Sequence, residues 1–235
     1  MNTGLRAVLH ISGVLVLALI LASCQTVNKL DTANFEGATL AANMQSPPAP
    51  RLDIRYDVTL DSHNPVYSAL SVMTNLAKAG QAQKAENAMR EALSSVDVPS
   101  LILDKAYVAC ASALRAHYEE QGMRADYLLL LSIHDWGIEA TSPGTAVSLH
   151  IRLTASLLRN HGGELVWRRN FTVNDPASPD MFGLGQIVGN MVTATVLSNM
   201  TAQQMADGFE ELARRSARSV AKHLQNDLYS ARYGS

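Results

Sequence analysis

The sequence predicts an α+β fold in which one mostly antiparallel sheet of four strands has amphipathic helices packed on one face. Two observations lead to this prediction. First, three strand-like segments follow one another between residues 125 and 173, and residues 147–157 alternate cleanly between apolar and polar side chains. Second, the C-terminal segment after residue 201 places apolar and charged residues on opposite sides of a helix.

The four expected strands are separated by segments with strong turn or helix signals. Residues 51–60 alternate as a first strand, and residues 66–94 are rich in helix-forming residues. Asp97 and Pro99 predict the start of a second helix that ends near Glu120. The turn at residues 160–163 joins the last two strands and predicts that Arg152 lies near Asn170, and His150 near Thr172. Thr201 to Gln204 fits a capping box that opens the final helix.

The N-terminus has the features of a secretory signal. Arg6 is followed by an apolar run that ends in Leu21-Ala22-Ser23-Cys24, and a cysteine at this position resembles a bacterial lipoprotein signal. The resemblance implies that residues 1–23 are removed, that Cys24 is lipidated, and that this lipid anchors the chain in a membrane. Gln25, rather than Asp, favours the outer membrane, with the protein facing the periplasm. An uncleaved spanning helix is the alternative, but the apolar run is short for a bilayer.

Polar residues and a proline-rich end characterise residues 24–50, which are therefore expected to be a flexible tether. Residues 51–235 are expected to form the periplasmic domain. Removing Arg6 with the signal leaves 18 basic and 21 acidic residues, a formal charge of −3. This near-neutral charge shows no excess of basic residues of the kind that nucleic-acid-binding proteins use to contact phosphates. A hydrophobic content of 47% is enough for a real core.

Several stretches resemble a group of small periplasm-facing lipoproteins. Residues 124–137 contain an Ala-Asp pair before a strand, and residues 163–167 match a Gly-x-x-x-Trp pattern. Residues 183–200 and the final helix are similar to one branch of this group, the proposed outer-membrane lipoproteins with a fold like the N-terminal domain of TolB. The auxiliary lipoproteins of ABC-type transporters have a comparable strand order. The resemblance covers residues 125–228 and implies an envelope assembly or transport accessory, with no catalytic residues.

The sequence contains no recognised catalytic, cofactor-binding or metal-binding motif. Cys110 has apolar neighbours at helical spacing, which favours a buried side chain over a nucleophile. His134 could face His150, but a regular strand would turn Asp135 to the opposite side, so no metal site is predicted. The expected function is therefore a non-enzymatic accessory that binds an envelope protein or itself. A lipid-handling subunit of a transport system is the alternative.

Two surfaces are candidates for partner binding. The first is the polar strand face, with His150, Arg152 and Arg168, although an ordinary solvated sheet face would look similar. The second is the uncharged segment 181–206, whose candidate contact residues are Met181, Gly183, Gly185 and Gly189. This segment could equally be a buried helix within the domain or in a homo-oligomer.

Overall fold

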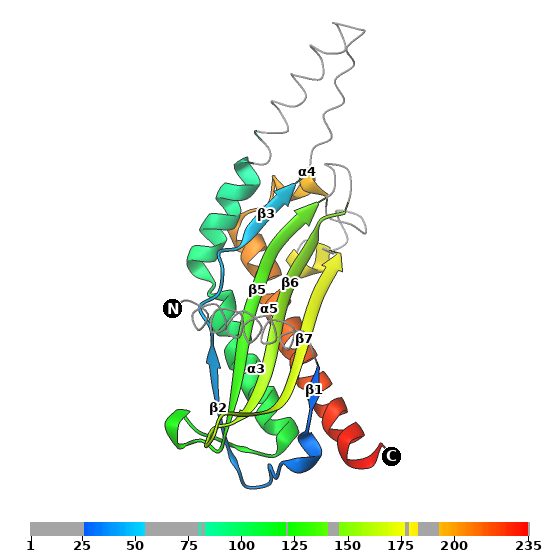
Figure 1. Cartoon of the computed structure of the whole chain (residues 1–235). Helices are drawn as coiled ribbons and strands as arrows, with labels where there is room; N and C mark the ends of the chain where they lie inside the picture. Colours follow the sequence, from blue (N-terminus) through cyan, green and yellow to red (C-terminus); the bar gives the residue numbers. More distant parts are fainter. Residues whose placement is uncertain are drawn as a thin grey trace, which may run out of the picture.

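A mixed β-sheet with two long helices on one face forms the centre of the protein (Figure 1). The computed structural model describes residues 26–54, 80, 83–120, 122–140, 146–176, 179–182 and 193–234. Within these residues the strands are β1 (Val27–Asn28), β2 (Thr39–Met44), β3 (Arg51–Ile54), β4 (His117–Tyr118), β5 (Tyr127–Ala140), β6 (Ser148–Arg159) and β7 (Glu164–Pro176). The helices are a segment over 83–95, α3 (Val98–Leu114), α4 (Ala194–Leu197) and α5 (Ala202–Tyr233). Short 3-10 turns are η2 (Leu30–Thr32), η3 (Gly122–Arg124) and η4 (Pro179–Phe182).

The predicted α+β class is confirmed, but the sheet differs from the predicted one. The described residues form seven strands in the order β1-β7-β6-β5-β2-β4, and β3 pairs with β5 beyond the end of β2. The β5-β6-β7 meander is antiparallel, whereas β2 and β3 both run parallel to β5, and β4 runs parallel to β2. The predicted first strand, residues 51–60, includes β3, although its parallel pairing was not expected. The prediction missed β2 and β4 because they are short, and because distant strands rather than local alternation determine their burial.

Part of the predicted tether belongs to the folded domain. In the sheet order, β2 lies between β5 and β4, and β1 pairs with the outer edge of β7. Leu30, Phe35 and Leu40 are fully buried, with exposed fractions of 0%, 1% and 0%. The domain therefore begins near Val27 rather than at residue 51, which corrects the predicted boundary. The predicted signal (residues 1–23) and Cys24 lie outside the described residues.

The helix boundaries follow the capping signals in the sequence. In α3, Ser100 donates its backbone N–H to Asp97 Oδ1 over 3.1 Å, and Pro99 lies in the first turn, as predicted. The helix ends at Leu114, earlier than predicted, because Arg115 takes a left-handed conformation with φ of 57°. In α5, the predicted capping box between Thr201 and Gln204 is confirmed.

The described part of the uncharged segment packs into the core. Met181 and Phe182 in η4 are 4% and 0% exposed, and Leu197 in α4 is also buried. A Cβ at Gly208 of α5 would lie 2.4 Å from Phe182 Cε1, so the absence of a side chain there lets η4 approach the helix. Met181 is therefore a core residue and not a surface for partners. The predicted contact residues Gly183, Gly185 and Gly189 lie outside the described residues.

Candidate binding surface on the open face of the sheet

The two faces of the sheet have different surroundings. Helices α3 and α5 lie behind the sheet in Figure 1, where they cover the face that presents Leu129, Leu131 and Ile133. The opposite face has none of the described helices packed on it. We call this surface the open face; along β6 it presents His150, Arg152, Thr154 and Ser156 in alternation with buried residues.

A β-bulge in β5 changes which side chains share the open face. Ile133 pairs with Leu153 and Asp135 pairs with Arg152, so His134 is the extra residue between them. Such an insertion interrupts the two-residue alternation of a strand. His134 and Asp135 consequently both lie on the open face, and Trp136 returns to the core with 3% exposure. The expectation that Asp135 points away from the polar face was wrong for this reason.

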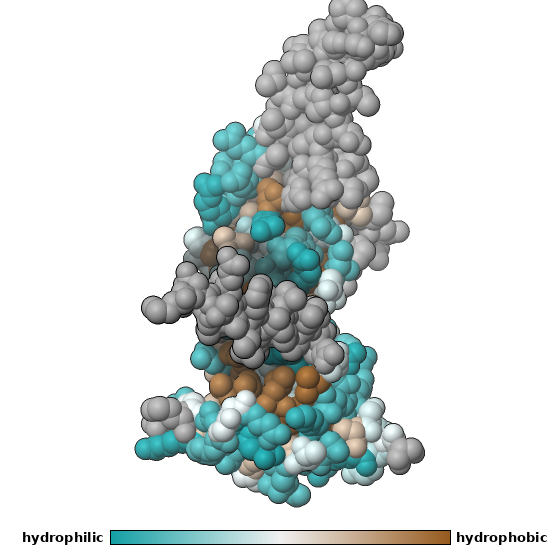
Figure 2. All heavy atoms as spheres, viewed as in Figure 1, coloured by the Kyte–Doolittle hydropathy of each residue, from teal (hydrophilic) through white to brown (hydrophobic). Residues whose placement is uncertain are grey.

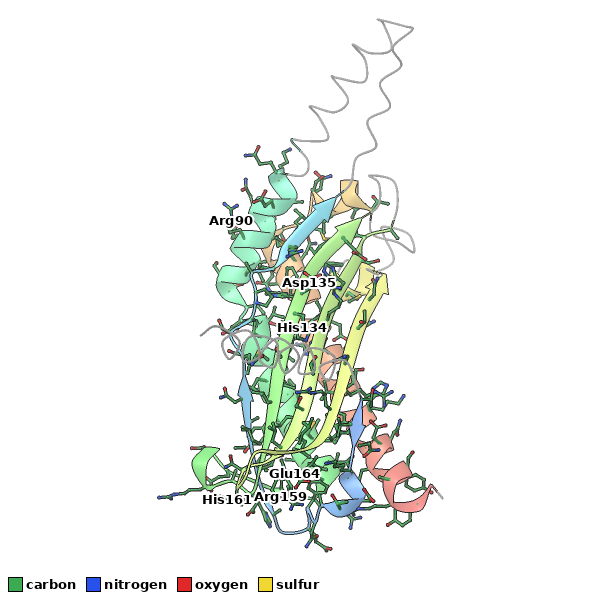
Figure 3. The ribbon with its side chains drawn as sticks, viewed as in Figure 1. Arg90, His134, Asp135, Arg159, His161 and Glu164 are labelled. Carbon is green, nitrogen blue, oxygen red and sulfur yellow. The ribbon has the colours of Figure 1, made fainter. Side chains whose placement is uncertain are left out.

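Asp135 is the centre of a charged cluster at one end of the open face (Figure 3). Arg152 Nη2 donates to Asp135 Oδ2 over 2.8 Å, and His150 Nε2 lies 3.5 Å from the same oxygen. Arg51, at the start of β3, brings its Nε to 3.6 Å from Oδ1. The Asp135 side chain is only 14% exposed, whereas that of Arg152 is 60% exposed. The cluster therefore has a shielded carboxylate with an accessible guanidinium.

The surroundings of Asp135 favour its ionised form. Partial burial alone would raise the pKa of this carboxyl. The hydrogen bond from Arg152 and the electrostatic effects of His150, Arg152 and Arg51 outweigh burial, and the pKa of Asp135 lies below its ordinary value. In the described part of the chain, His150 Nδ1 is buried without a hydrogen-bond partner. The imidazole is thus held through its Nε2 side alone.

A chain of side-chain hydrogen bonds continues along the same face. His134 Nε2 lies 2.7 Å from Thr154 Oγ1, which donates to Asn170 Oδ1 over 2.7 Å. Because the hydroxyl proton is used in the bond to Asn170, His134 must donate rather than accept in this arrangement. The pair is therefore not arranged as a base and nucleophile.

The pairing of β6 with β7 differs from the predicted register. His150 pairs with Asn174, and Arg152 pairs with Thr172, each two residues further along β7 than expected. The two strands contain an irregularity, since Leu157 pairs with Trp167 but Leu158 pairs with Leu165. The bulge accounts for one residue of this shift, and the hairpin, where Arg159 pairs with Glu164, accounts for the other. This register places Arg168 opposite Ser156, whose Oγ accepts from Arg168 Nε over 3.3 Å.

The open face changes from polar to apolar along the strands. His150, Arg152 and Arg168 lie on this same face, as predicted, but Arg168 is separated from the Asp135 cluster by the Thr154 row. Beyond Arg168 the face presents half-buried leucines at positions 128, 130, 158 and 165. Figure 2 shows apolar side chains gathered on the lower part of this face and hydrophilic ones above. The surface thus has a charged end and an apolar end.

Neither a reactive thiol nor a metal-binding cluster is found in the described residues. Cys110 is fully buried, and burial raises the pKa of its thiol to about 12, so it is a packing residue. The described residues contain no group of three or more His, Cys, Asp or Glu side chains that could hold a metal ion. Within the same residues, no helix is long and apolar enough to span a bilayer.

Comparisons with known proteins find only distant likenesses. No family model matches the sequence, and no curated protein matches it. A solved structure from Xanthomonas campestris, assigned to the family DUF330, aligns with a TM-score of 0.36 and 14% identity over 81% of this chain and 85% of that one. A proposed lipoprotein from Caulobacter crescentus aligns with a TM-score of 0.32 and 19% identity over 61% of this chain and 97% of that one. At these TM-scores, neither fold nor function can be transferred to this chain.

Proposed function

We propose that this protein is a non-enzymatic accessory of the cell envelope, anchored by lipid on Cys24 and facing the periplasm from the outer membrane. It binds an envelope protein, or a second copy of itself, through the open face of the sheet. The observation that supports binding is the one-sided packing, because the face opposite the helices combines an exposed Arg152 with half-buried leucines. A surface with an apolar part and charged groups is typical of protein interfaces.

Site-specific photocrosslinking in cells tests the open face. A photoreactive residue at Arg152 or Arg168 is expected to capture one envelope protein or the protein itself. The same residue at Lys105, an exposed position on α3, is the control because α3 lies on the other side of the sheet. A specific product from the two β-strand positions supports the proposal. Identical patterns from all three positions, or no product from the open face, would contradict it.

Fractionation tests the anchor separately. Cys24→Ser removes the acyl acceptor, and we expect the variant to lack lipid by mass spectrometry of the N-terminal peptide. Wild-type protein is expected in the outer-membrane fraction with a lipidated Cys24. An unmodified Cys24 in wild-type protein would rule out the anchor, whatever the crosslinking shows.

A lipid-handling subunit of an envelope transport system is the second candidate. The four half-buried leucines at one end of the open face favour it, since they could contact acyl chains. Phospholipid that copurifies with wild-type protein and is lost in Leu130→Glu would support this role. Equal lipid content in wild type and variant would count against it. Val108→Glu, at a residue of α3 that is 53% exposed, is the control for added charge away from the open face.

A further inference from the structure

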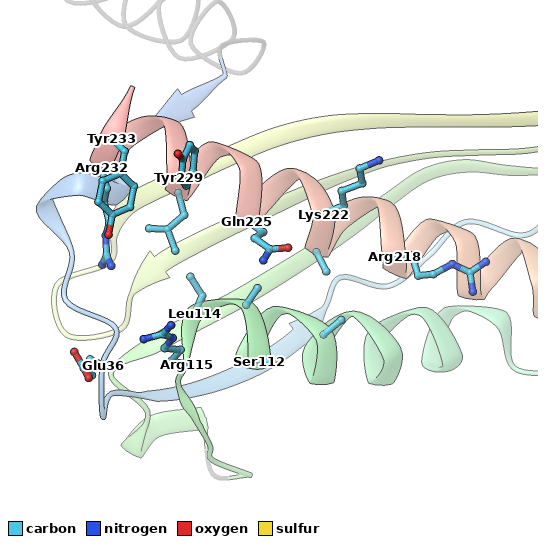
Figure 4. A pocket seen from close by; sticks show the side chains of 14 residues that line it. Glu36, Ser112, Leu114, Arg115, Arg218, Lys222, Gln225, Tyr229, Arg232 and Tyr233 are labelled. Atoms are coloured by element: carbon cyan, nitrogen blue, oxygen red, sulfur yellow. The ribbon is translucent and has the colours of Figure 1, made fainter. Parts of the chain in front are cut away.

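A groove opens between the C-terminal ends of α3 and α5, away from the open face of the sheet (Figure 4). Its volume is about 760 Å³. Four cationic side chains line it, namely Arg115, Arg218, Lys222 and Arg232, against a single carboxylate, Glu36. Four positive charges and one negative charge leave a formal charge of +3 in a chain whose overall charge is −2. The groove is therefore a local concentration of positive charge.

The fold holds these cations in the groove by different means. Arg218 and Lys222 are one turn apart on α5, so they share one side of that helix. Arg115 enters from α3, at the residue that ends the helix in a left-handed conformation. Arg232 Nη2 donates to the carbonyl of Ala33 over 3.3 Å, and its guanidinium lies 6.0 Å from the centre of the Phe35 ring.

Much of this charge is not neutralised within the described residues. Arg218 Nη2 lies 2.9 Å from Glu211 Oε1, but Arg215 also forms an ion pair with this oxygen. No described carboxylate forms an ion pair with Lys222 or Arg115, and both side chains belong to exposed residues. Clustered cations repel one another, so an anion that enters the groove would relieve this repulsion.

Apolar groups lie beside the cations. Tyr229 and Tyr233 are 66% and 69% exposed, and their ring centres are 5.2 Å apart. Leu114 and Leu228 also line the groove. Exposed aromatic rings next to positive charge suit a ligand with both an anionic group and a less polar part.

We propose that this groove binds a phosphate-bearing anion. Guanidinium groups match the geometry of phosphate oxygens, and a lysine adds a compact positive charge. The phosphate could belong to the headgroup of an anionic phospholipid or to a soluble phosphate compound. Both sources share the chemistry that Arg115, Lys222 and their neighbours recognise.

The position of the groove favours the lipid headgroup, an argument that rests on the proposed anchor at Cys24. Only residues 25 and 26 lie between Cys24 and Val27, which limits the span to roughly 10 Å. The chain from Asn28 to Ala33 packs on the end of α5, where Asn28 Nδ2 donates to the Asp227 carbonyl over 3.1 Å. The groove and the anchored N-terminus therefore lie around the same end of α5.

Calorimetric titration of the full-length protein in non-ionic detergent tests the proposal without depending on lipidation. The titrants are dihexanoyl-phosphatidylglycerol, dihexanoyl-phosphatidylcholine and inorganic phosphate. We expect phosphatidylglycerol to bind more tightly than phosphatidylcholine, and its affinity to fall as salt is added, because exposed charges are screened. Arg115→Ala with Lys222→Ala is expected to weaken binding by roughly tenfold or more.

Lys105→Ala with Arg124→Ala is the matched control, since it removes one exposed lysine and one exposed arginine outside the groove. Lys222→Arg should retain binding. Tighter binding of phosphatidylglycerol than of phosphate identifies a lipid headgroup, and equal binding identifies a soluble phosphate compound as the ligand class. The proposal is overturned if no titrant binds, or if the groove variant and the control lose affinity equally. An unlipidated Cys24 would remove only the preference for lipid.

Discussion

Single residues determine how closely β3 approaches β5 and which charges meet on the sheet. At Gly137, φ is 148°, and a Cβ would lie 1.9 Å from the carbonyl oxygen of Arg51 in the neighbouring strand. Two residues earlier, the β-bulge turns Asp135 toward Arg51, Arg152 and His150. The same short stretch of β5 therefore admits β3 and forms the charged cluster.

Gly137→Ala is expected to destabilise the protein by about 2 kcal/mol or more, because strained backbone and a backbone clash would have to be relieved together. Urea unfolding measured by circular dichroism gives the free energy of unfolding. Gly122→Ala is the control, since a Cβ there meets nothing within 4 Å. Equal stability of both variants would show that β3 does not pack against Gly137.

Asp135 also predicts a pH dependence of stability. Its pKa is lowered in the folded protein, so its ionised form contributes stability above the ordinary aspartate pKa of about 3.9, and this contribution is lost as the pH falls through the lowered pKa. We expect Asp135→Asn to be less stable than wild type at pH 7 and to lose less stability on acidification. Thermal unfolding from pH 7 to pH 3 measures this, with Asp104→Asn on α3 as the control. Parallel curves for wild type and Asp135→Asn would contradict the cluster.

At the scale of elements, α5 is attached to the sheet by apolar packing and by the hydrogen bonds of Asp227. Phe209, Leu212, Val220 and Leu224 are fully buried beneath the sheet. Near the end of the helix, Asp227 accepts from Trp167 Nε1 over 2.9 Å and from Arg169 Nη1 over 2.8 Å. Trp167 itself is fully buried. Asp227 thereby accepts a hydrogen bond from an indole N–H that would otherwise lack a partner in the core.

Asp227→Ala is expected to cost about 2–4 kcal/mol, because it leaves the buried Trp167 N–H and the half-buried Arg169 without their acceptor. A double-mutant cycle with Trp167→Phe measures the coupling through the free energy of unfolding. The two changes should cost less together than the sum of their separate effects. Additive losses would mean that Asp227 and Trp167 act independently.

At the scale of the whole molecule, the N-terminal segment 26–44 is part of the domain. It supplies an edge strand, β1, and an internal strand, β2, to the sheet. Asp126 Oδ2 accepts from both the backbone N–H and the hydroxyl of Thr39, each over 2.8 Å, which fixes the start of β2 against β5. A lipid on Cys24 would consequently hold the folded domain close to the membrane surface rather than at the end of a long tether.

Phe35→Ala tests whether this segment is structural. Phe35 is 1% exposed, and its ring centre lies 4.8 Å from that of Tyr127. We expect a loss of about 3 kcal/mol in the free energy of unfolding, as for other large buried aromatic residues. Asp31→Ala, at an exposed position in the same segment, should change stability by less than about 0.5 kcal/mol. If neither change alters the free energy of unfolding, the segment is a flexible tether, as the sequence predicted.

The sequence by itself determined the elements that local signals specify. The caps at Asp97 and Thr201 predicted the starts of α3 and α5, and alternation predicted β6 and its two faces. It also placed His150, Arg152 and Arg168 on one face, since a strand alternates with a period of two. These features depend on neighbours within a few residues, which a sequence displays directly.

Only the tertiary structure decided the features that depend on distant parts of the chain. Two bulges, at His134 and beside Leu158, set the register and turned Asp135 onto the open face. The strand β2 came from a segment predicted to be a tether, and its parallel pairing with β5, like that of β3, joins parts of the chain that lie far apart in the sequence. The basic groove joins residues from α3, α5 and the loop at Glu36. Each of these features depends on contacts between residues far apart in the sequence. The local sequence around any one residue does not specify such contacts.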